Sequence, residues 1–496
     1  MGRTINIMLA VMVTASSAYA ADDAVTRAMK LLEKRHYEEA AGVLRGDPAL
    51  SDPAKQGTAN LALGMAYFKN AVLHRELYQA SLSASQDYLK KLSAAQGRDR
   101  SRFVDLFLGD LLVEIGKPGI AASSFEKLIA TEGVDPRYQA IAKVGLGLSH
   151  HLSNDAAKAT ALWAAIDTAD PEVKAELAAA YSRAGILDKS PLGMVDESLA
   201  ASKKSGKPVS MRMLKNAVAV YARSTGLTEK GLDLLKRSDL KSFSFRETLG
   251  KSKVINFYDL SLLGDMATLY GQASLSYLGK AVGDAKTKDA AEYYLGQAHA
   301  LFGSLDQSGK VTASFIAASK MPASYKDRVR VWQGANAYQK NRDVASAMGI
   351  WDELSRKQPE DPDVLAEILS ACGRLKVECP KIVQKGASAV DAGDSKKTAP
   401  LNVAMGRYYL GKLDNARAVA YLEAGRDKSN KNKIEANEPV TLVNLAEAYF
   451  RTKKFSEALE IYFEMSKQFP EVRQLQEAMQ GVYAMEHKSA GDVKIN

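Results

Sequence analysis

The sequence predicts an all-α protein, a solenoid in which pairs of helices stack one on the next. Three observations predict this fold. Residues 443–470, "VNLAEAYFRTKKFSEALEIYFEMSKQFP", have the apolar spacing of two helices joined by a polar turn. Four further stretches repeat the same offsets between small and large residues. Segments between them, such as "MRMLKNAVAVYARS", keep a helical apolar period although they lose those offsets.

The C-terminal pair of helices shows the offsets most clearly. Ala446 is followed three residues later by Tyr449, and Ala458 is followed four residues later by Tyr462. The alanines let the two helices approach closely, and the tyrosines fill the space beside them. Pro470 is expected to end the second helix, because proline lacks the backbone N–H that a helix needs.

The same spacing recurs between residues 108 and 422, and each unit places its second small residue twelve positions after the first. These units contain Leu108, Gly109, Leu112, Ala121 and Phe125; Leu146, Gly147, His150, Ala159, Trp163 and Pro171; Ala335, Tyr338, Ala347, Trp351, Leu354 and Pro359; and Gly406, Tyr409, Ala418 and Leu422. Leu63 and Gly64 with Tyr67 begin a further unit, whose second small residue we expect near Ala84. Residues 27–44 are expected to form a degenerate first unit.

These offsets resemble the tetratricopeptide repeat (TPR) family, whose pattern is Leu-Gly-x2-Tyr on a first helix, Ala-x3-Phe on a second helix, and then proline. The resemblance implies a right-handed α-solenoid of stacked TPR-type hairpins. It also implies that the first helix of each hairpin lines a concave surface, which is a place to hold a partner.

The repeat offsets divide the chain into ranges. The register fades beyond residue 188, where "SKKSGKP" (residues 202–208) has the composition of a linker. We therefore expect two helical arrays that meet near residues 188–210. The expected ranges are a signal peptide (1–20), an N-terminal array (21–188), an irregular helical middle section with a basic linker (189–325), a C-terminal array (326–486) and a polar tail (487–496).

The first twenty residues are expected to direct export. Arg3 supplies a positive charge, residues 5–13 are apolar except for Asn6, and Ala18-Tyr19-Ala20 offers a cleavage site before Ala21. A membrane anchor would need about 18 to 20 apolar residues, which is twice the length of this run. No cysteine stands at the cleavage point, so a lipoprotein is not expected. The sequence therefore predicts an exported, periplasmic protein with no transmembrane segment.

Positive charge is concentrated in one part of the chain. The net charge is +9, and residues 203–253 contain thirteen Lys or Arg but four acids. Nucleic acid is not expected as a periplasmic partner. An alternative function is therefore the binding of anionic envelope polysaccharide or lipid by this section, with Lys203, Lys204 and Lys207 as the basic patch. The other interpretation is a set of solvated helix faces.

The sequence carries no motif for catalysis, a cofactor or a metal: it lacks H-E-x-x-H, a haem site, a phosphate loop and a nucleophile elbow. His150 and His151 are adjacent, so on a helix they point about 100° apart. Glu197-Ser198 is the one match to the catalytic Glu-Ser of solenoidal lytic transglycosylases, and the neighbourhoods typical of that family are missing. We expect a protein that is not an enzyme, with the transglycosylase as a minor alternative.

Cys372 and Cys379 are the two cysteines of the chain. In an oxidising compartment they are expected to form a disulfide that joins two helices across a turn. A redox role is not expected, because C-x6-C is not a redox motif.

The TPR resemblance also implies which residues line the groove: those three before, one after and four after the small residue of each first helix. Carried over, the set is Leu61, Met65, Phe68, Leu106, Asp110, Val113, Val144, Leu148, His151, Trp332, Asn336, Gln339, Val403, Arg407, Leu410, Val443, Glu447 and Phe450. This set is largely apolar and contains no Lys, which disfavours a carboxylate clamp. It suits an amphipathic or apolar segment of a partner, although apolar stripes are also typical of inter-repeat core. The leading hypothesis is a periplasmic scaffold that binds partner proteins in a cell-envelope assembly, such as an export, polysaccharide-secretion or outer-membrane complex.

Overall fold

The computed structural model describes residues 23–94, 101–206, 209–224, 226, 228–235, 257–357, 362–392, 395–426, 438–470, 472, 475, 479 and 482. Within these ranges all regular structure is helical, so the expected all-α fold of stacked helical hairpins is confirmed. None of the described helices combines the length and the apolar character that crossing a bilayer requires. The expected signal peptide, Lys207 and the polar tail lie outside the described residues.

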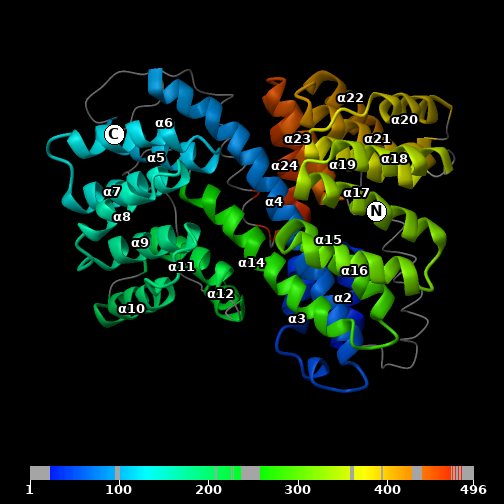
Figure 1. Cartoon of the computed structure of the whole chain (residues 1–496), viewed down its shortest axis with the longest axis horizontal. Helices are drawn as coiled ribbons and strands as arrows, with labels where there is room; N and C mark the ends of the chain where they lie inside the picture. Colours follow the sequence, from blue (N-terminus) through cyan, green and yellow to red (C-terminus); the bar gives the residue numbers. More distant parts are fainter. Residues whose placement is uncertain are drawn as a thin grey trace. The chain divides into compact units, whose positions relative to one another are not determined.

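Contacts group the chain into two units (Figure 1). Unit 1 consists of Met1–Glu76 and Tyr270–Gln476, and unit 2 consists of Leu77–Leu269 and Glu477–Asn496. The main points of division fall inside two long helices, α4 (Gln56–Ala94) and α14 (Phe257–Ala281). They do not fall near residues 188–210, and the two arrays expected to meet there remain a prediction.

The described residues of unit 2 form four successive hairpins. They pair α5 (Ser101–Glu114) with α6 (Pro118–Ala130), α7 (Pro136–Leu152) with α8 (Ala156–Ala164), α9 (Pro171–Arg183) with α10 (Pro191–Lys204), and α11 (Met211–Arg223) with α12 (Thr228–Leu235). The first helices of neighbouring hairpins, α5, α7, α9 and α11, pack against one another in that order. An aspartate and a proline start two of them: Asp135 accepts a hydrogen bond from the Arg137 N–H ahead of α7, and Asp170 does the same for Glu172 ahead of α9.

The described residues of unit 1 form further hairpins. They pair α2 (Ala24–Glu33) with α3 (Tyr37–Leu44), α15 (Lys288–Phe302) with α16 (Leu305–Ala318), α17 (Ala323–Asn341) with α18 (Val344–Lys357), α19 (Pro362–Leu375) with α20 (Pro380–Ala392), α21 (Ser395–Gly411) with α22 (Asn415–Gly425), and α23 (Pro439–Arg451) with α24 (Phe455–Gln468). A short 3-10 helix, Pro48–Leu50, follows α3. As in unit 2, the first helices α15, α17, α19, α21 and α23 pack in series.

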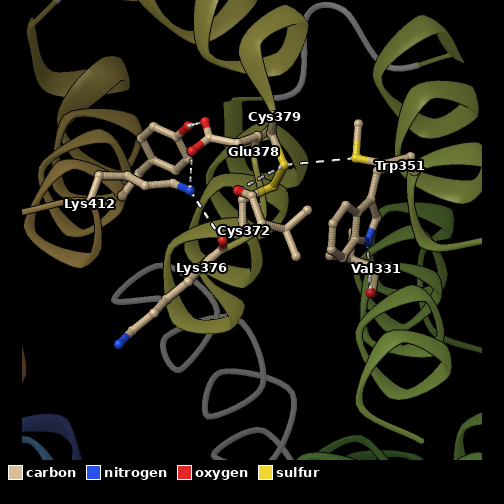
Figure 2. The surroundings of a disulfide bond; sticks show 10 residues. Val331, Trp351, Cys372, Lys376, Glu378, Cys379 and Lys412 are labelled. Atoms are coloured by element: carbon tan, nitrogen blue, oxygen red, sulfur yellow. Dashed lines mark hydrogen bonds and ion pairs between the residues drawn. A yellow bond between two sulfur atoms is a disulfide. The ribbon is translucent and has the colours of Figure 1, made fainter. Parts of the chain in front are cut away.

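Two tryptophans show how these hairpins are held together. Trp163 of α8 lies over Gly147 of α7, and its Nε1 donates a hydrogen bond to the Val144 carbonyl at 3.1 Å. Trp351 of α18 lies over Gly334 of α17 in the same way, and its Nε1 donates to the Val331 carbonyl at 3.0 Å (Figure 2). A side chain on either glycine would collide with the indole, so the absence of a side chain on the glycine makes room for the tryptophan ring. This is the small-on-large packing that the repeat offsets predict, and it occurs in both units.

The second repeat is built differently from our expectation. We expected a small residue of its second helix near Ala84, but Ala84 continues α4. The second helix is instead the C-terminal part of α14, because Leu278 occupies the space that a Cβ on Gly64 would need. Tyr67 stacks on Tyr270, with ring centroids 6.0 Å apart. The expectation was wrong because the sequence pattern of a first helix does not say how far along the chain its partner lies.

The two ends of unit 1 meet. Arg35, in the turn between α2 and α3, forms an ion pair of 3.2 Å with Glu438, which precedes α23, and the Tyr37 hydroxyl donates to the same carboxylate at 3.0 Å. Asn444 of α23 donates to Glu76 of α4 at 2.7 Å. Helices from the beginning and the end of unit 1 therefore contact each other directly.

A disulfide joins Cys372 near the end of α19 to Cys379 just before α20, with a sulfur–sulfur distance of 2.04 Å (Figure 2). Both cysteines are fully buried. Lys412 ties the intervening turn to α21, because its Nζ donates to the Lys376 carbonyl at 3.1 Å and to Glu378 at 2.6 Å. The disulfide and the lysine thus hold the same turn from two sides.

Removal of this disulfide is expected to lower the free energy of unfolding by about 2 to 3 kcal/mol, because a short closed loop restricts the unfolded chain. Chemical denaturation of the oxidised and the reduced protein measures the effect without any change of sequence. The Cys372→Ala/Cys379→Ala double variant is the control, and a reducing agent should not shift its transition. An equal shift in that variant would show that the reductant acts elsewhere.

Candidate functional site

Most of the residues expected to line a groove are buried. The buried ones are Leu61, Met65, Phe68, Leu106, Val144, Leu148, Trp332, Asn336, Leu410, Val443, Glu447 and Phe450, and the partly exposed ones are Asp110, Val113, His151, Gln339, Val403 and Arg407. Several have partners inside their own unit. Trp332 Nε1 donates to Glu367 at 2.7 Å, and Arg407 Nε donates to Asn444 at 2.8 Å. Inter-repeat packing accounts for this burial, and a role of these residues in partner binding remains a prediction.

The basic section is divided between surface and interior. Lys203 and Lys204 are exposed at the end of α10. In contrast, Arg212 and Lys215 of α11 are each 4% exposed, and Arg212 is paired with acidic residues. Part of the positive charge counted in the sequence is therefore neutralised inside unit 2.

Glu197 does not occupy the environment of a general acid. Its side chain is 70% exposed and forms an ion pair of 3.0 Å with Lys174. The adjacent Ser198 hydroxyl donates to the Met194 carbonyl one turn back, at 2.7 Å. A carboxyl that donates a proton in glycoside cleavage is instead typically held in an apolar pocket.

Unit 2 contains a pocket of about 280 Å³. It is lined by residues from α4 (Tyr78), α5 (Val113, Glu114), α7 (Leu148, Leu152), α9 (Arg183), α11 (Arg223) and α14 (Gly264, Asp265). Every first helix of the four hairpins contributes, and four of the lining residues are the last residue of their helix: Glu114, Leu152, Arg183 and Arg223. The pocket thus forms where the C-terminal ends of the first helices come together.

Two arginines share one buried carboxylate in this pocket. The Asp265 side chain is 3% exposed and accepts from Arg183 Nη2 at 3.1 Å and from Arg223 Nη1 at 2.8 Å. Burial alone would raise the pKa of Asp265, but the charges of Arg183 and Arg223 hold it below its ordinary value. Asp265 is therefore a carboxylate at neutral pH, and it fixes the positions of both guanidinium groups.

The opposite wall of the pocket pairs an acid with a tyrosine. Arg183 Nη1 lies 3.4 Å from Glu114 Oε1, and the Tyr78 hydroxyl donates to Glu114 Oε2 at 2.6 Å. Burial and the negative charge of Glu114 raise the pKa of the Tyr78 hydroxyl well above its ordinary value. Tyr78 therefore stays protonated and acts as a hydrogen-bond donor, not as a base.

A second charged cluster lies on the same face of α11. Arg212 Nε donates to Glu176 at 2.5 Å, and Arg212 Nη2 lies 3.3 Å from Asp110. The charges of Arg212 and Lys215 hold the pKa of Glu176 below its ordinary value despite its burial, whereas burial raises the pKa of Asp110. Glu176 has the shorter contact with Arg212, so it keeps its charge more readily than Asp110 as the pH falls.

Sequence reasoning identified Asp110 on this face and named Val113 and Leu148, but it missed Tyr78, Glu114, Arg183, Arg223 and Asp265. The offset rule counts from the small residue in the middle of each first helix, whereas these residues lie at helix ends or on long helices. A useful signal would have been the charged residue that ends three of the four first helices: Glu114, Arg183 and Arg223.

The pocket has the features of a binding site. It combines fixed charges of both signs with the apolar side chains of Val113, Leu148 and Leu152. Among the described residues, no group of three or more His, Cys, Asp or Glu side chains is placed to hold a metal ion.

No protein-family model and no curated protein matches the chain. Among solved structures, the chain is similar to yeast Tom70, with 14% identity and a TM-score of 0.32 over 95% of this chain and 97% of that one. It is also similar to a chain of the APC/C hetero-tetramer Cut9-Hcn1, with 13% identity and a TM-score of 0.27 over 96% of this chain and 98% of that one. The stacked helical hairpins are shown by the helix pairing described above.

Proposed function

We propose that the protein is a non-catalytic repeat scaffold that binds a partner protein in a cell-envelope assembly, and that the partner contacts the pocket of unit 2. The observation that carries this proposal is the convergence of four first helices on a pocket with charged and apolar walls. Side chains at the pocket reach solvent: Arg223 is 32% exposed and Leu152 is 45% exposed. Arginine is enriched among the residues that contribute most to binding at protein interfaces, and the buried centre of such an interface is apolar.

An exported, periplasmic location is part of this proposal. It rests on residues 1–20, which carry the positive charge, the apolar run and the cleavage site of a secretory signal. Recovery of a chain that begins at Ala21 from the periplasmic fraction would support it. Recovery of the full-length chain from the cytoplasm alone would contradict it.

Affinity capture with the full mature chain tests partner binding. The Leu152→Asp variant places a charge on the apolar wall of the pocket, and its exposed position should tolerate the change. We expect it to reduce recovery of the bound partner by about ten-fold or more, as for a residue near the centre of an interface.

Leu187→Asp is the matched control, because Leu187 is 67% exposed in the same unit and does not line the pocket. Recovery should be unchanged in this variant. If both variants retain the partner, the partner does not use the pocket. If mild crosslinking captures no partner even with the unchanged chain, the scaffold function is wrong.

The alternative of binding an anionic polymer through the basic section is less well supported. Arg212 and Arg223 of that section face acidic partners in unit 2, which leaves Lys203 and Lys204 as the exposed members of the patch among the described residues. Two exposed lysines contribute only a weak, salt-sensitive attraction.

A further inference from the structure

The arginines of the pocket have hydrogen-bond donors to spare. Arg223 uses Nη1 for both Asp265, at 2.8 Å, and the Ala219 carbonyl, at 2.9 Å. Within the described part of the chain, its Nε and Nη2 have no hydrogen-bond partner. These two atoms form the side edge of the guanidinium group, whose two parallel N–H bonds match the two oxygens of a carboxylate. Arg223 is therefore held by one edge and free at the other.

The acidic groups of the pocket are already engaged. The oxygens of Asp265 accept from Arg183 and Arg223, and those of Glu114 contact Arg183 and Tyr78. Each of the four carboxylate oxygens thus has a donor, so a cationic ligand would compete with the arginines and Tyr78 for carboxylates whose charge is already compensated. A ligand that brings its own acceptor oxygens would not.

The carbonyl groups at the helix ends do not reverse this preference. The C-terminal end of a helix favours a cation when its last carbonyls are unpaired. Here turn N–H groups engage them: Ile186 donates to the Tyr181 carbonyl, and Lys117 donates to the Leu112 carbonyl. At the end of α11, Arg223 itself bonds the Ala219 carbonyl. The donors of Arg223 remain the main unfilled polar capacity of the pocket.

Buried positive charge lies nearby as well. Lys215 is 4% exposed, and among the described residues it has no hydrogen-bond or ion-pair partner. Its charge acts on the carboxylates of both clusters, Asp265 on one side and Glu176 on the other. The face of α11 that carries Arg223 therefore holds a further cation, Lys215, in addition to Arg223.

The remaining wall of the pocket is apolar. Val113, Leu148 and Leu152 come from two adjacent first helices, α5 and α7, whereas Arg223 comes from α11. A ligand that meets both must have a polar head and a short apolar body. The volume of about 280 Å³ suits a small molecule.

We propose that the pocket of unit 2 binds a small free carboxylate that carries a short apolar group, with Arg223 as the carboxylate-binding residue and Leu148 and Leu152 as the apolar contacts. This inference goes beyond the scaffold function. It concerns a small molecule, so it can be tested without the protein partner.

Isothermal titration calorimetry of the full mature chain tests the proposal with three probes: hexanoate, acetate and hexylammonium. Hexanoate is expected to bind more tightly than acetate, which lacks the apolar body, and hexylammonium is expected not to bind. Arg223→Gln should weaken hexanoate binding by about ten-fold or more, because a charge-assisted pair is lost. Equal binding of hexanoate and hexylammonium, or unchanged hexanoate binding by Arg223→Gln, would overturn the proposal.

Two further variants control for folding and for charge. Leu152→Gln alters an exposed side chain, so it should fold normally while narrowing the difference between hexanoate and acetate. Lys174→Gln removes a positive charge from the same unit at an ion pair outside the pocket, and it should bind hexanoate as the unchanged chain does. If Lys174→Gln loses hexanoate binding as Arg223→Gln does, net charge and not the contact with Arg223 accounts for the binding. If Leu152→Gln keeps the preference for hexanoate over acetate, Leu152 does not contact the apolar group of the ligand. If the unchanged chain binds hexanoate but captures no partner protein, the scaffold function is wrong and the carboxylate site is retained.

Discussion

Replacing Trp351 with alanine is expected to lower the free energy of unfolding of unit 1 by about 3 to 5 kcal/mol, the range found for large buried aromatic side chains. Trp351 is fully buried, and its ring fills the space above Gly334. The backbone of α17 cannot move in to fill the vacated volume without breaking its packing on α19. The Val331 carbonyl would also lose its bond from the indole N–H.

Denaturant unfolding followed by circular dichroism measures this loss. Trp351→Phe separates its two causes, because it keeps most of the apolar area but removes the indole N–H, and it should be less destabilising. Phe463→Ala is the surface control, since Phe463 is 48% exposed and its removal leaves no cavity. If Trp351→Ala unfolds no more easily than Phe463→Ala, the tryptophan does not hold the hairpin together.

The sequence predicts this part of the fold well because the signal is local. Trp351 follows Ala347 by four residues, and Trp163 follows Ala159 by four, so the same offset puts a large side chain on the inner side of each second helix. Both tryptophans are buried at hairpin contacts. Spacing of this kind depends only on the helical period, which the sequence displays directly.

Other parts of the fold depend on contacts between distant segments. Gly64 packs against Leu278, more than two hundred residues later, and Arg35 pairs with Glu438. No local pattern around Gly64 indicates which later helix will cover it. Some hairpin turns are also hidden from the sequence, because Arg342 and Leu413 adopt positive φ without the glycine that usually marks such a position.

The candidate site also combines residues that a local sequence pattern indicates with residues that only contacts between distant segments bring together. The offset rule placed Asp110 in a partner-binding groove, which remains a prediction, and in the structure Asp110 lies 3.3 Å from Arg212. It could not predict that Arg183 and Arg223 converge on Asp265, because this requires the ends of α9 and α11 to meet α14. The sequence shows these residues only as scattered charges, and their partners become evident when the first helices are packed side by side.

Replacing Asp265 with alanine is expected to lower the free energy of unfolding of unit 2 by about 3 kcal/mol, because removal of one member of a buried ion pair leaves the other members without compensation. Arg183 and Arg223 would both lose their closest acidic partner, and Arg183 would keep only the longer contact with Glu114. Their partial exposure to water keeps the effect at the lower end of the range for buried pairs.

The pH dependence of this effect separates charge from packing. The pKa of Asp265 is lower in the folded chain than its ordinary value, so the ionised carboxylate stabilises the folded state. This contribution is fully present above the ordinary Asp pKa of about 3.9 and is lost as the pH falls through the lower folded value.

Asp265→Asn keeps the shape of the side chain and removes the charge. The difference in stability between the unchanged chain and Asp265→Asn should therefore be constant near neutral pH and shrink towards zero in acid. Glu176 also has a lowered pKa but is present in both proteins, so its contribution cancels in the comparison. A difference that persists unchanged at acid pH would mean that Asp265 acts through its shape and hydrogen bonds, and that the two arginines do not depend on its charge.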